Sequence, residues 1–196
     1  MAKLYFTYSA MNAGKSTILL QSAYNYRERG MQVMLWTSGH YREDDKDTAE
    51  ICSRIGLKAD AHLYRDGLDL FDAIAAHKSE GPLDSVFVDE AQFLSPEQVW
   101  QLARVADRLG LPVMCYGLRT DFQGKLFPGS AELLAIADQL REVRTICHCG
   151  RKATMTARMD EEGRAMVEGA QVDVDKAHYV SLCRRHWEEE TKVSPA

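Results

Sequence analysis

The residues from Ser9 to Ser16 form the pattern of a phosphate-binding loop. They match G-x-x-x-x-G-K-[ST] at every position except the first, where serine replaces glycine. In such a loop, backbone N–H groups surround a phosphate at the start of a helix. Gly14 permits close approach of the backbone, Lys15 supplies a cation for the β- and γ-phosphates, and Ser16 supplies a hydroxyl for Mg²⁺. The sequence therefore predicts an ATP site whose loop also includes Ser9, Ala10, Met11, Asn12 and Ala13.

A pair of acidic residues, Asp89 and Glu90, follows the apolar run that begins at Ser85. Ligands of α/β sheets bind at the carboxyl ends of strands, and phosphoryl transfer needs an acid that holds the metal opposite the phosphate loop. We expect Asp89 to bind Mg²⁺, directly or through water, and Glu90 to act as a general base. The pair alone does not decide between a base that activates water, as in an ATPase, and one that deprotonates a substrate hydroxyl, as in a kinase.

Two short pairs of metal-binding residue types lie near the C-terminus. The first is Cys-His-Cys and the second is Cys-Arg-Arg-His, with 33 residues between Cys149 and Cys183. A structural Zn²⁺ takes four sulfur or nitrogen ligands, usually delivered in pairs by turns. His148 and His178 are alternative ligands, whereas the isolated Cys52 and Cys115 are expected in the core. The predicted ligands of a closed structural zinc site are Cys147, Cys149, Cys183 and His186.

The elements that must position these residues follow from apolar patterning and helix caps. Strands are predicted at Lys3–Tyr8, Val33–Thr37, Ala59–Tyr64, Ser85–Asp89 and Pro112–Tyr116, and helices at Ser16–Arg29, Leu70–His77, between Ser95 and Gly110, and at Ser130–Asp138. Alternating strands and helices predict an α/β fold with a mainly parallel sheet, as in P-loop NTPases. We expect residues 1–145 to form this ATP-binding domain and residues 146–196 to form a small zinc-binding domain.

The composition is that of a globular protein. The chain has 196 residues, of which 27% are charged, and a net charge of −5, which argues against a nucleic-acid partner. The sequence holds no apolar run of about 18 residues and no signal-peptide pattern. Its five cysteines are an odd number, which does not suggest a disulfide framework. We expect a cytoplasmic protein that binds no membrane.

Four features in this order carry a resemblance to a known family. They are the segments Ser9–Thr17, Asp89–Phe93 and Tyr116–Phe122, and the paired cysteine and histidine ligands. Together they resemble thymidine kinase, in the zinc-containing class that bacteria share with the cytosol of higher cells. The resemblance implies transfer of the γ-phosphate of ATP to the 5′-hydroxyl of thymidine, giving thymidine monophosphate for DNA synthesis. It also implies a homo-oligomer, commonly a tetramer, that thymidine triphosphate inhibits.

The resemblance also implies roles for single residues. Glu90 matches the catalytic base, and Gln92, in the same segment, matches a residue at the cofactor. A loop before Tyr179 folds over the nucleobase. Positions that match nucleoside contacts are Met11, Phe93, Leu118, Phe122, Arg158, Val172, Val174 and Tyr179. Met11 and Leu118 match positions near the thymine 5-methyl group. Two features depart from the family pattern: no Gly-Gly pair precedes Tyr179, and Arg42 lacks the aspartate that usually precedes it.

Two other functions fit parts of the sequence. A plain ATPase would use the same loop and acids, and would release phosphate without a nucleoside. A nucleotide-gated module that reads nucleic acid with the zinc domain needs a basic surface, but residues 147–196 carry 8 Lys/Arg against 9 Asp/Glu. A preference between thymidine and deoxyuridine depends on one methyl group, worth about 1–3 kcal/mol, and does not follow from the sequence.

Overall fold

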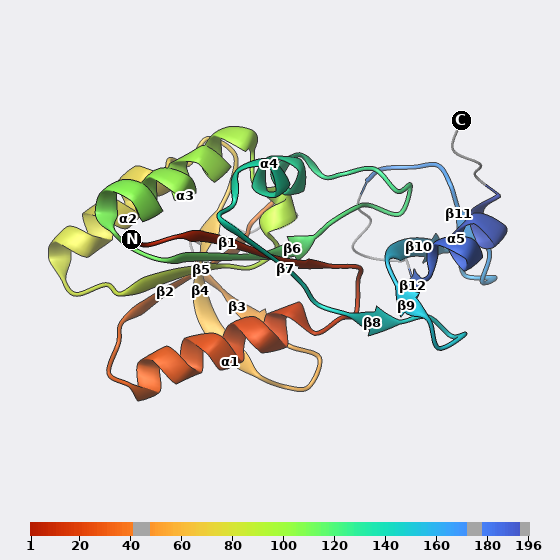
Figure 1. The fold of residues 1–196 in the computed structure, drawn as a ribbon, viewed down its shortest axis with the longest axis horizontal. Helices are drawn as coiled ribbons and strands as arrows, with labels where there is room; N and C mark the ends of the chain where they lie inside the picture. Colours follow the sequence, from red (N-terminus) through yellow and green to blue (C-terminus); the bar gives the residue numbers. More distant parts are fainter. Residues whose placement is uncertain (41–47, 172–177, 193–196) are drawn as a thin grey trace.

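The computed structural model describes residues 1–40, 48–171 and 178–192. Its largest element is a seven-stranded sheet with the order β3-β4-β2-β5-β6-β1-β7 (Figure 1). The strands are β1 (Leu4–Ser9), β2 (Val33–Ser38), β3 (Thr48–Cys52), β4 (Lys58–Tyr64), β5 (Ser85–Val88), β6 (Val113–Leu118) and β7 (Gln139–Glu142). Every neighbouring pair is parallel except β3 and β4. The expected α/β fold is confirmed.

Helices cover both faces of this sheet (Figure 1). Helix α1 (Lys15–Glu28) lies on one face, and α2 (Leu70–Glu80), α3 (Pro96–Leu109) and α4 (Pro128–Ile136) lie on the other. Each face has its own hydrophobic cluster, one that includes Leu19 and Phe87 and one that includes Ile74, Leu102 and Leu133. Because β5 is covered on both sides, all four of its residues are buried, which explains why three successive apolar residues, Val86, Phe87 and Val88, follow Ser85.

The register of the parallel strands brings the predicted catalytic segments to one edge. Ser9 at the end of β1 pairs with Leu118 at the end of β6, and Val88 of β5 pairs with Cys115 of β6. The phosphate-binding loop, the acidic pair after β5 and the loop after β6 therefore leave the sheet side by side. This is the edge where α/β sheets bind their ligands.

The C-terminal part of the chain forms two small sheets and a helix. Strands β8 (Thr145–Ile146) and β9 (Lys152–Ala153) form a hairpin, and β10 (Met155–Met159), β11 (Ala165–Met166) and β12 (His178–Leu182) form a three-stranded antiparallel sheet. Helix α5 (Arg184–Thr191) packs on it through Trp187. This part contacts the phosphate-binding loop: Met11 N donates to Thr156 Oγ1 at 3.2 Å, and Ser181 Oγ donates to Met11 O.

Sequence and structure agree at the long elements and differ at the edges. The capping box of α3 is present, with Ser95 and Gln98 bonding each other's backbone, and Gly110 ends that helix at φ 67°. The sequence did not predict the short edge strands β3 and β7. Cys115 is buried as expected, but the expectation for Cys52 was wrong: it lies exposed at the end of edge strand β3. The domain division at 145/146 falls within β8 and stays a prediction.

Within the residues that the structure describes, no helix is long and apolar enough to cross a membrane.

Candidate functional site

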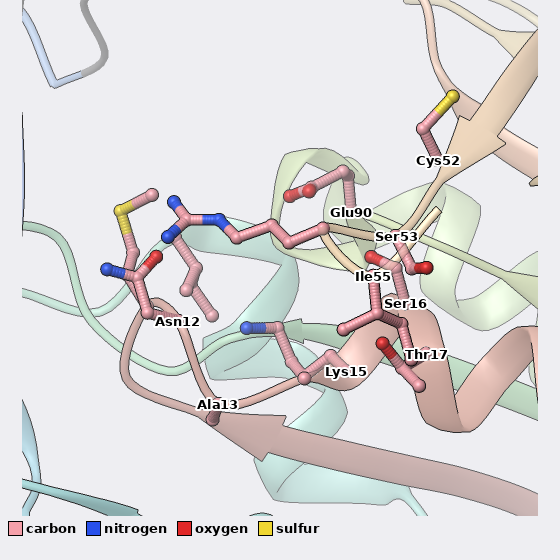
Figure 2. A pocket seen from close by; sticks show the side chains of 13 residues that line it. Asn12, Ala13, Lys15, Ser16, Thr17, Cys52, Ser53, Ile55 and Glu90 are labelled. Atoms are coloured by element: carbon pink, nitrogen blue, oxygen red, sulfur yellow. The ribbon is translucent and has the colours of Figure 1, made fainter. Parts of the chain in front are cut away.

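A cavity of about 370 Å³ lies at the carboxyl edge of the sheet, where the phosphate-binding loop meets the loops after β3 and β5 (Figure 2). The loop enters helix α1 through two residues in the left-handed region, Asn12 at φ 61° and Gly14 at φ 85°. These two residues turn the chain around the cavity, while α1 begins at Lys15 with its N-terminus toward it. Of the predicted site residues, those from Met11 to Ser16, Glu90 and Leu118 line this one cavity.

Lys15 is positioned at the base of the cavity by its own loop. Its Nζ donates to Ser9 Oγ at 3.0 Å and lies 3.5 Å from Ala10 O. Burial lowers the pKa of Lys15 from its ordinary value, although the nearby Glu90 and Asp89 carboxylates act in the opposite direction. In Figure 2, Glu90 lies across the cavity from Ala13 and Lys15. An anion that enters between them would meet a desolvated ammonium group and a helix N-terminus.

Asp89 has the surroundings of a metal ligand. It is buried, and it shares a side-chain hydrogen bond with Ser16 of the phosphate-binding loop. Its Oδ1 atom is buried without a hydrogen-bond partner among the described residues. Burial raises the pKa of Asp89 to about 7, and the neighbouring Glu90 charge adds to this effect. A carboxylate oxygen left without a partner beside a serine hydroxyl fits Mg²⁺, which prefers oxygen ligands.

Glu90 is held in an unusual backbone conformation. Its φ of 54° lies in the left-handed region, a strained state for a residue with a side chain. The Tyr64 hydroxyl donates to Glu90 O at 2.7 Å, and Gln92 Nε2 donates to Glu90 Oε2 at 2.5 Å. Gln92 Oε1 in turn accepts from Leu118 N at 3.0 Å, so one buried amide links the carboxylate to β6. The contacts described for Gln92 are thus with Glu90 and β6 rather than with the phosphate-binding loop.

The turn between β3 and β4 forms one wall of the cavity, and the sequence did not predict this contribution. Cys52, Ser53, Arg54 and Ile55 all line the cavity, and Figure 2 shows Ser53 and Ile55 next to Glu90. Arg54 is exposed and adds a second cation to the lining. No motif marks this turn; the available signal was a basic residue shortly before Gly56, which takes the left-handed φ of 90° that a tight turn needs.

The residues expected around the nucleoside lie in several places. Met11 and Leu118 line the cavity described above, whereas Phe122 is buried and lines a separate cavity of about 170 Å³ with Trp187. Phe93 is partly buried, with its ring 5.6 Å from the Phe127 ring. Tyr179 is on β12, and its carbonyl accepts from Asn12 Nδ2 at 3.2 Å. The remaining expectations, on Val172, Val174 and Arg42, lie outside the described residues.

Arg158, which was expected at the nucleoside, is a buried side chain that bonds to the backbone of the same C-terminal part of the chain. It lies on β10 with 2% of its surface exposed. Its two terminal nitrogens donate to the carbonyls of Ala170 and Glu168 at 2.8 and 2.9 Å.

The four predicted zinc ligands come together. The ligand atoms of Cys147, Cys149, Cys183 and His186 all lie within 4.8 Å of one another and could hold a metal ion. His186 directs Nδ1 to the thiols, at 3.3 Å from Cys147 Sγ, while its Nε2 lies 3.7 Å from a Glu189 oxygen. A carboxylate on the outer nitrogen is the usual support of a metal-binding histidine. Of the two alternative ligands, His148 lies beside the cluster, with Nδ1 3.7 Å from Cys147 Sγ, and His178 is exposed on β12.

Comparisons with known proteins identify the family of this chain. A family model described as thymidine kinase matches residues 2–187. A thymidine kinase of Mesorhizobium japonicum is 65% identical over 190 residues, which cover 97% of this chain and 93% of the relative. One from Agrobacterium fabrum is 60% identical over 190 residues, with 96% and 97% covered. One from Yersinia pseudotuberculosis is 54% identical over 196 residues, with 99% and 98% covered.

Proposed function

This chain belongs to the thymidine kinase family, and we propose that it transfers the γ-phosphoryl group of ATP to the 5′-hydroxyl of thymidine. The observation that carries the proposal is the convergence of Lys15, Glu90 and Leu118 on one cavity, with Asp89 just behind it. The names of the relatives support thymidine as the acceptor. The products are ADP and thymidine monophosphate, a precursor for DNA synthesis.

The geometry supports a division of roles in the reaction. The loop from Ser9 to Ser16 binds the phosphates of ATP, and the Lys15 ammonium group stabilises the negative charge on the transferred group. Glu90 accepts the proton of the 5′-hydroxyl while that oxygen forms a bond to the γ-phosphorus and the bond to the ADP oxygen breaks. Gln92 orients the Glu90 carboxylate through its amide N–H. Arg54, which also lines the cavity, is a second cation for the triphosphate.

Two metal ions complete the proposal. Mg²⁺ would be held by Ser16 and Asp89, whose unpartnered Oδ1 is suited to it, and would neutralise charge on the β- and γ-phosphates. Zn²⁺ would be held by the four-residue cluster described above. With four protein ligands, that zinc site is closed and has no open position for a substrate, so its role is structural.

For the nucleoside, we propose contacts with Met11, Leu118, Phe93 and Tyr179. Met11 and Leu118 are apolar groups at the cavity that also holds Glu90, which suits a thymine methyl group. Phe93 lies three residues after Glu90 and is partly exposed. Phe122, Val172 and Val174 complete the set implied by the family resemblance.

Location and assembly are further parts of the proposal. A cytoplasmic enzyme has ATP available and keeps cysteine ligands reduced. The only partners proposed are small molecules and further copies of this chain, as a tetramer. Leu140, half exposed on edge strand β7, is the kind of apolar surface that a second copy would cover. Sedimentation at several protein concentrations tests this part.

The test of the function is an assay of ADP formation with ATP and Mg²⁺, in the presence and absence of thymidine, deoxyuridine, deoxycytidine and deoxyguanosine. The proposal predicts that ADP forms rapidly with thymidine and slowly without a nucleoside. Equal ADP formation without a nucleoside would support the ATPase alternative. No activity on either thymidine or deoxyuridine would refute the proposal.

A further inference from the structure

Arg158 is a buried cation to which the proposed reaction gives no role. Only 2% of its surface is exposed, although it lies on a five-residue strand of a small sheet. Moving a charged side chain out of water is unfavourable unless polar partners replace the water. The groups that replace water around Arg158 therefore indicate which segments of the chain it holds in place.

The first partners are backbone carbonyls of the segment after β11. Nη1 donates to Ala170 O at 2.8 Å and Nη2 donates to Glu168 O at 2.9 Å. Between them lies Gly169, at φ 121°, where an added Cβ would be 2.4 Å from Nη2. The guanidinium group thus fills the space that a side chain at position 169 would need. The planar fork of an arginine suits two acceptors at once, which an ammonium group does not.

The second partner is the ring of Phe122, in the loop after β6. Arg158 Cζ lies 3.9 Å from the centre of that ring, within the range of a cation–π contact. Phe122 is itself buried, and its carbonyl accepts from Trp187 Nε1 at 3.2 Å. Phe122 is therefore held at two places: Arg158 contacts its ring, and Trp187 of α5 bonds to its backbone carbonyl.

Two further hydrogen bonds join the same two segments. Gln123 Nε2 donates to Val167 O at 2.9 Å, and Gln171 Nε2 donates to Asp121 Oδ2 at 3.0 Å. Asp121 Oδ1 accepts from the backbone N–H groups of Gln123 and Lys125, both at 2.9 Å, which makes the loop after β6 a fixed support. Arg158 lies between these two hydrogen bonds, so it is the central link between residues 167–171 and the loop that carries Phe122.

We propose that Arg158 is a positioning residue for the nucleoside, acting through Phe122 and the backbone of residues 168–170 instead of contacting substrate. In the register of β10 and β12 it also lies opposite Tyr179, another of the proposed nucleoside-binding aromatics. Both terminal nitrogens already donate to carbonyls, which is why a direct role is not assigned to them. The inference rests on the proposed thymidine kinase function.

The test is the variant Arg158→Met, which keeps a long side chain and removes the charge and the fork. The proposal predicts that KM for thymidine, and the thymidine dissociation constant measured by calorimetry without ATP, both rise at least about tenfold. KM for ATP should change less than about twofold, because the side-chain partners of Arg158 described above, Ala170, Glu168 and Phe122, are not residues of the phosphate-binding loop. Arg158→Lys should give a loss of similar size, since one ammonium group cannot serve both carbonyls.

A matched control is Arg164→Met, which removes an exposed arginine in the turn between β10 and β11 that pairs with Asp160 and Glu162. It should leave both KM values unchanged. If Arg158→Met does not fold, Gln171→Met provides the same test on an exposed residue: thymidine affinity should fall less, and ATP affinity should not change.

Several outcomes would overturn the inference. Unchanged thymidine affinity in a folded Arg158→Met variant is one, and an equal loss of thymidine and ATP affinity is another. Full affinity in Arg158→Lys would show that the charge alone matters. Binding of thymidine monophosphate should weaken by the same factor as that of thymidine; a much larger loss for the monophosphate would assign Arg158 to direct contact with a phosphoryl group. If the wild-type protein has no activity on thymidine, it is the proposed function that fails.

Discussion

The seven-stranded sheet and the C-terminal small sheets hold their functional groups by different physical means. The large sheet has a hydrophobic cluster on each face, and strand pairing fixes the positions of the phosphate-binding loop and Glu90. The C-terminal part has one small cluster, and two of its seven buried members, Cys147 and Cys183, are themselves predicted metal ligands. We expect a region with so little apolar core to depend for its stability on the zinc ion proposed for this cluster. ATP and nucleoside binding should therefore respond to different perturbations.

The largest expected effect is on catalysis at the large sheet. Glu90→Gln removes the base and keeps the shape of the side chain, so kcat should fall by about 10²–10⁴-fold. Affinities for ATP and thymidine should stay near those of the wild type, which equilibrium binding measures. Glu97→Gln, on the exposed first turn of α3, is the control and should keep full activity. Full turnover in Glu90→Gln would remove Glu90 from its proposed role.

The next effect tests the dependence of the small sheets on metal. Cys183→Ser should lower zinc affinity by more than about 100-fold, because it replaces a thiolate ligand in a closed site. Thymidine affinity should then fall at least about tenfold, since residues 178–182 lead directly into the metal cluster. ATP affinity should fall less, because the same segment meets the phosphate-binding loop only through the hydrogen bonds of Tyr179 and Ser181 with Asn12 and Met11. Zinc content by atomic absorption and binding by calorimetry give the two readouts.

Cys115→Ala is the matched control, since it removes a cysteine buried in β6 away from the metal ligands. It should leave the zinc content unchanged. If Cys183→Ser lowers ATP and thymidine affinity equally, the two regions do not act separately.

A third effect concerns the turn between β3 and β4. Arg54→Met removes the second cation from the phosphate cavity, and KM for ATP should rise about tenfold or more, with thymidine affinity unchanged. Arg29→Met, at the opposite end of α1, removes the same charge outside the cavity and should have no effect. Equal effects of the two variants would indicate that net charge, and not the position of Arg54, matters.

The sequence predicted the parts of the site whose chemistry is local. The phosphate-binding loop needs only the order of its own residues and a following helix, and the cysteine and histidine pairs bring together the residue types that zinc prefers. The capping box at Ser95 also depends on neighbours along the chain. These features could be predicted because each leaves a pattern among residues a few positions apart, and the zinc cluster combines two such patterns.

The features that the sequence did not reveal depend on packing between distant segments. Arg54 reaches the cavity because β3 pairs with β4 in antiparallel fashion at the sheet edge, and Cys52 is exposed for the same reason. The hydrogen bonds of Gln92 with Glu90 and β6, and the stacking of Arg158 on Phe122, arise only in the folded chain. No spacing pattern encodes such contacts.

The smallest expected effect concerns the orientation of Glu90 at the edge of the large sheet. Gln92→Met removes the amide that orients Glu90, and kcat should fall about tenfold, the cost of one hydrogen bond to a charged group. Gln101→Met is the matched control: Gln101 is also buried, and its Oε1 accepts from Leu70 N at 2.9 Å far from the cavity. The control should lower the free energy of unfolding without lowering kcat. A loss of kcat in both variants would point to a general structural effect.

The central claim is that Glu90 takes its proton from the substrate's 5′-hydroxyl and not from water. The most direct test is ADP release by the wild-type protein with 5′-deoxythymidine, which keeps the base and sugar but lacks that hydroxyl. We expect this nucleoside to bind, to compete with thymidine and to leave ATP intact. ADP release at the rate seen with thymidine would show that water is the acceptor, and would contradict the account.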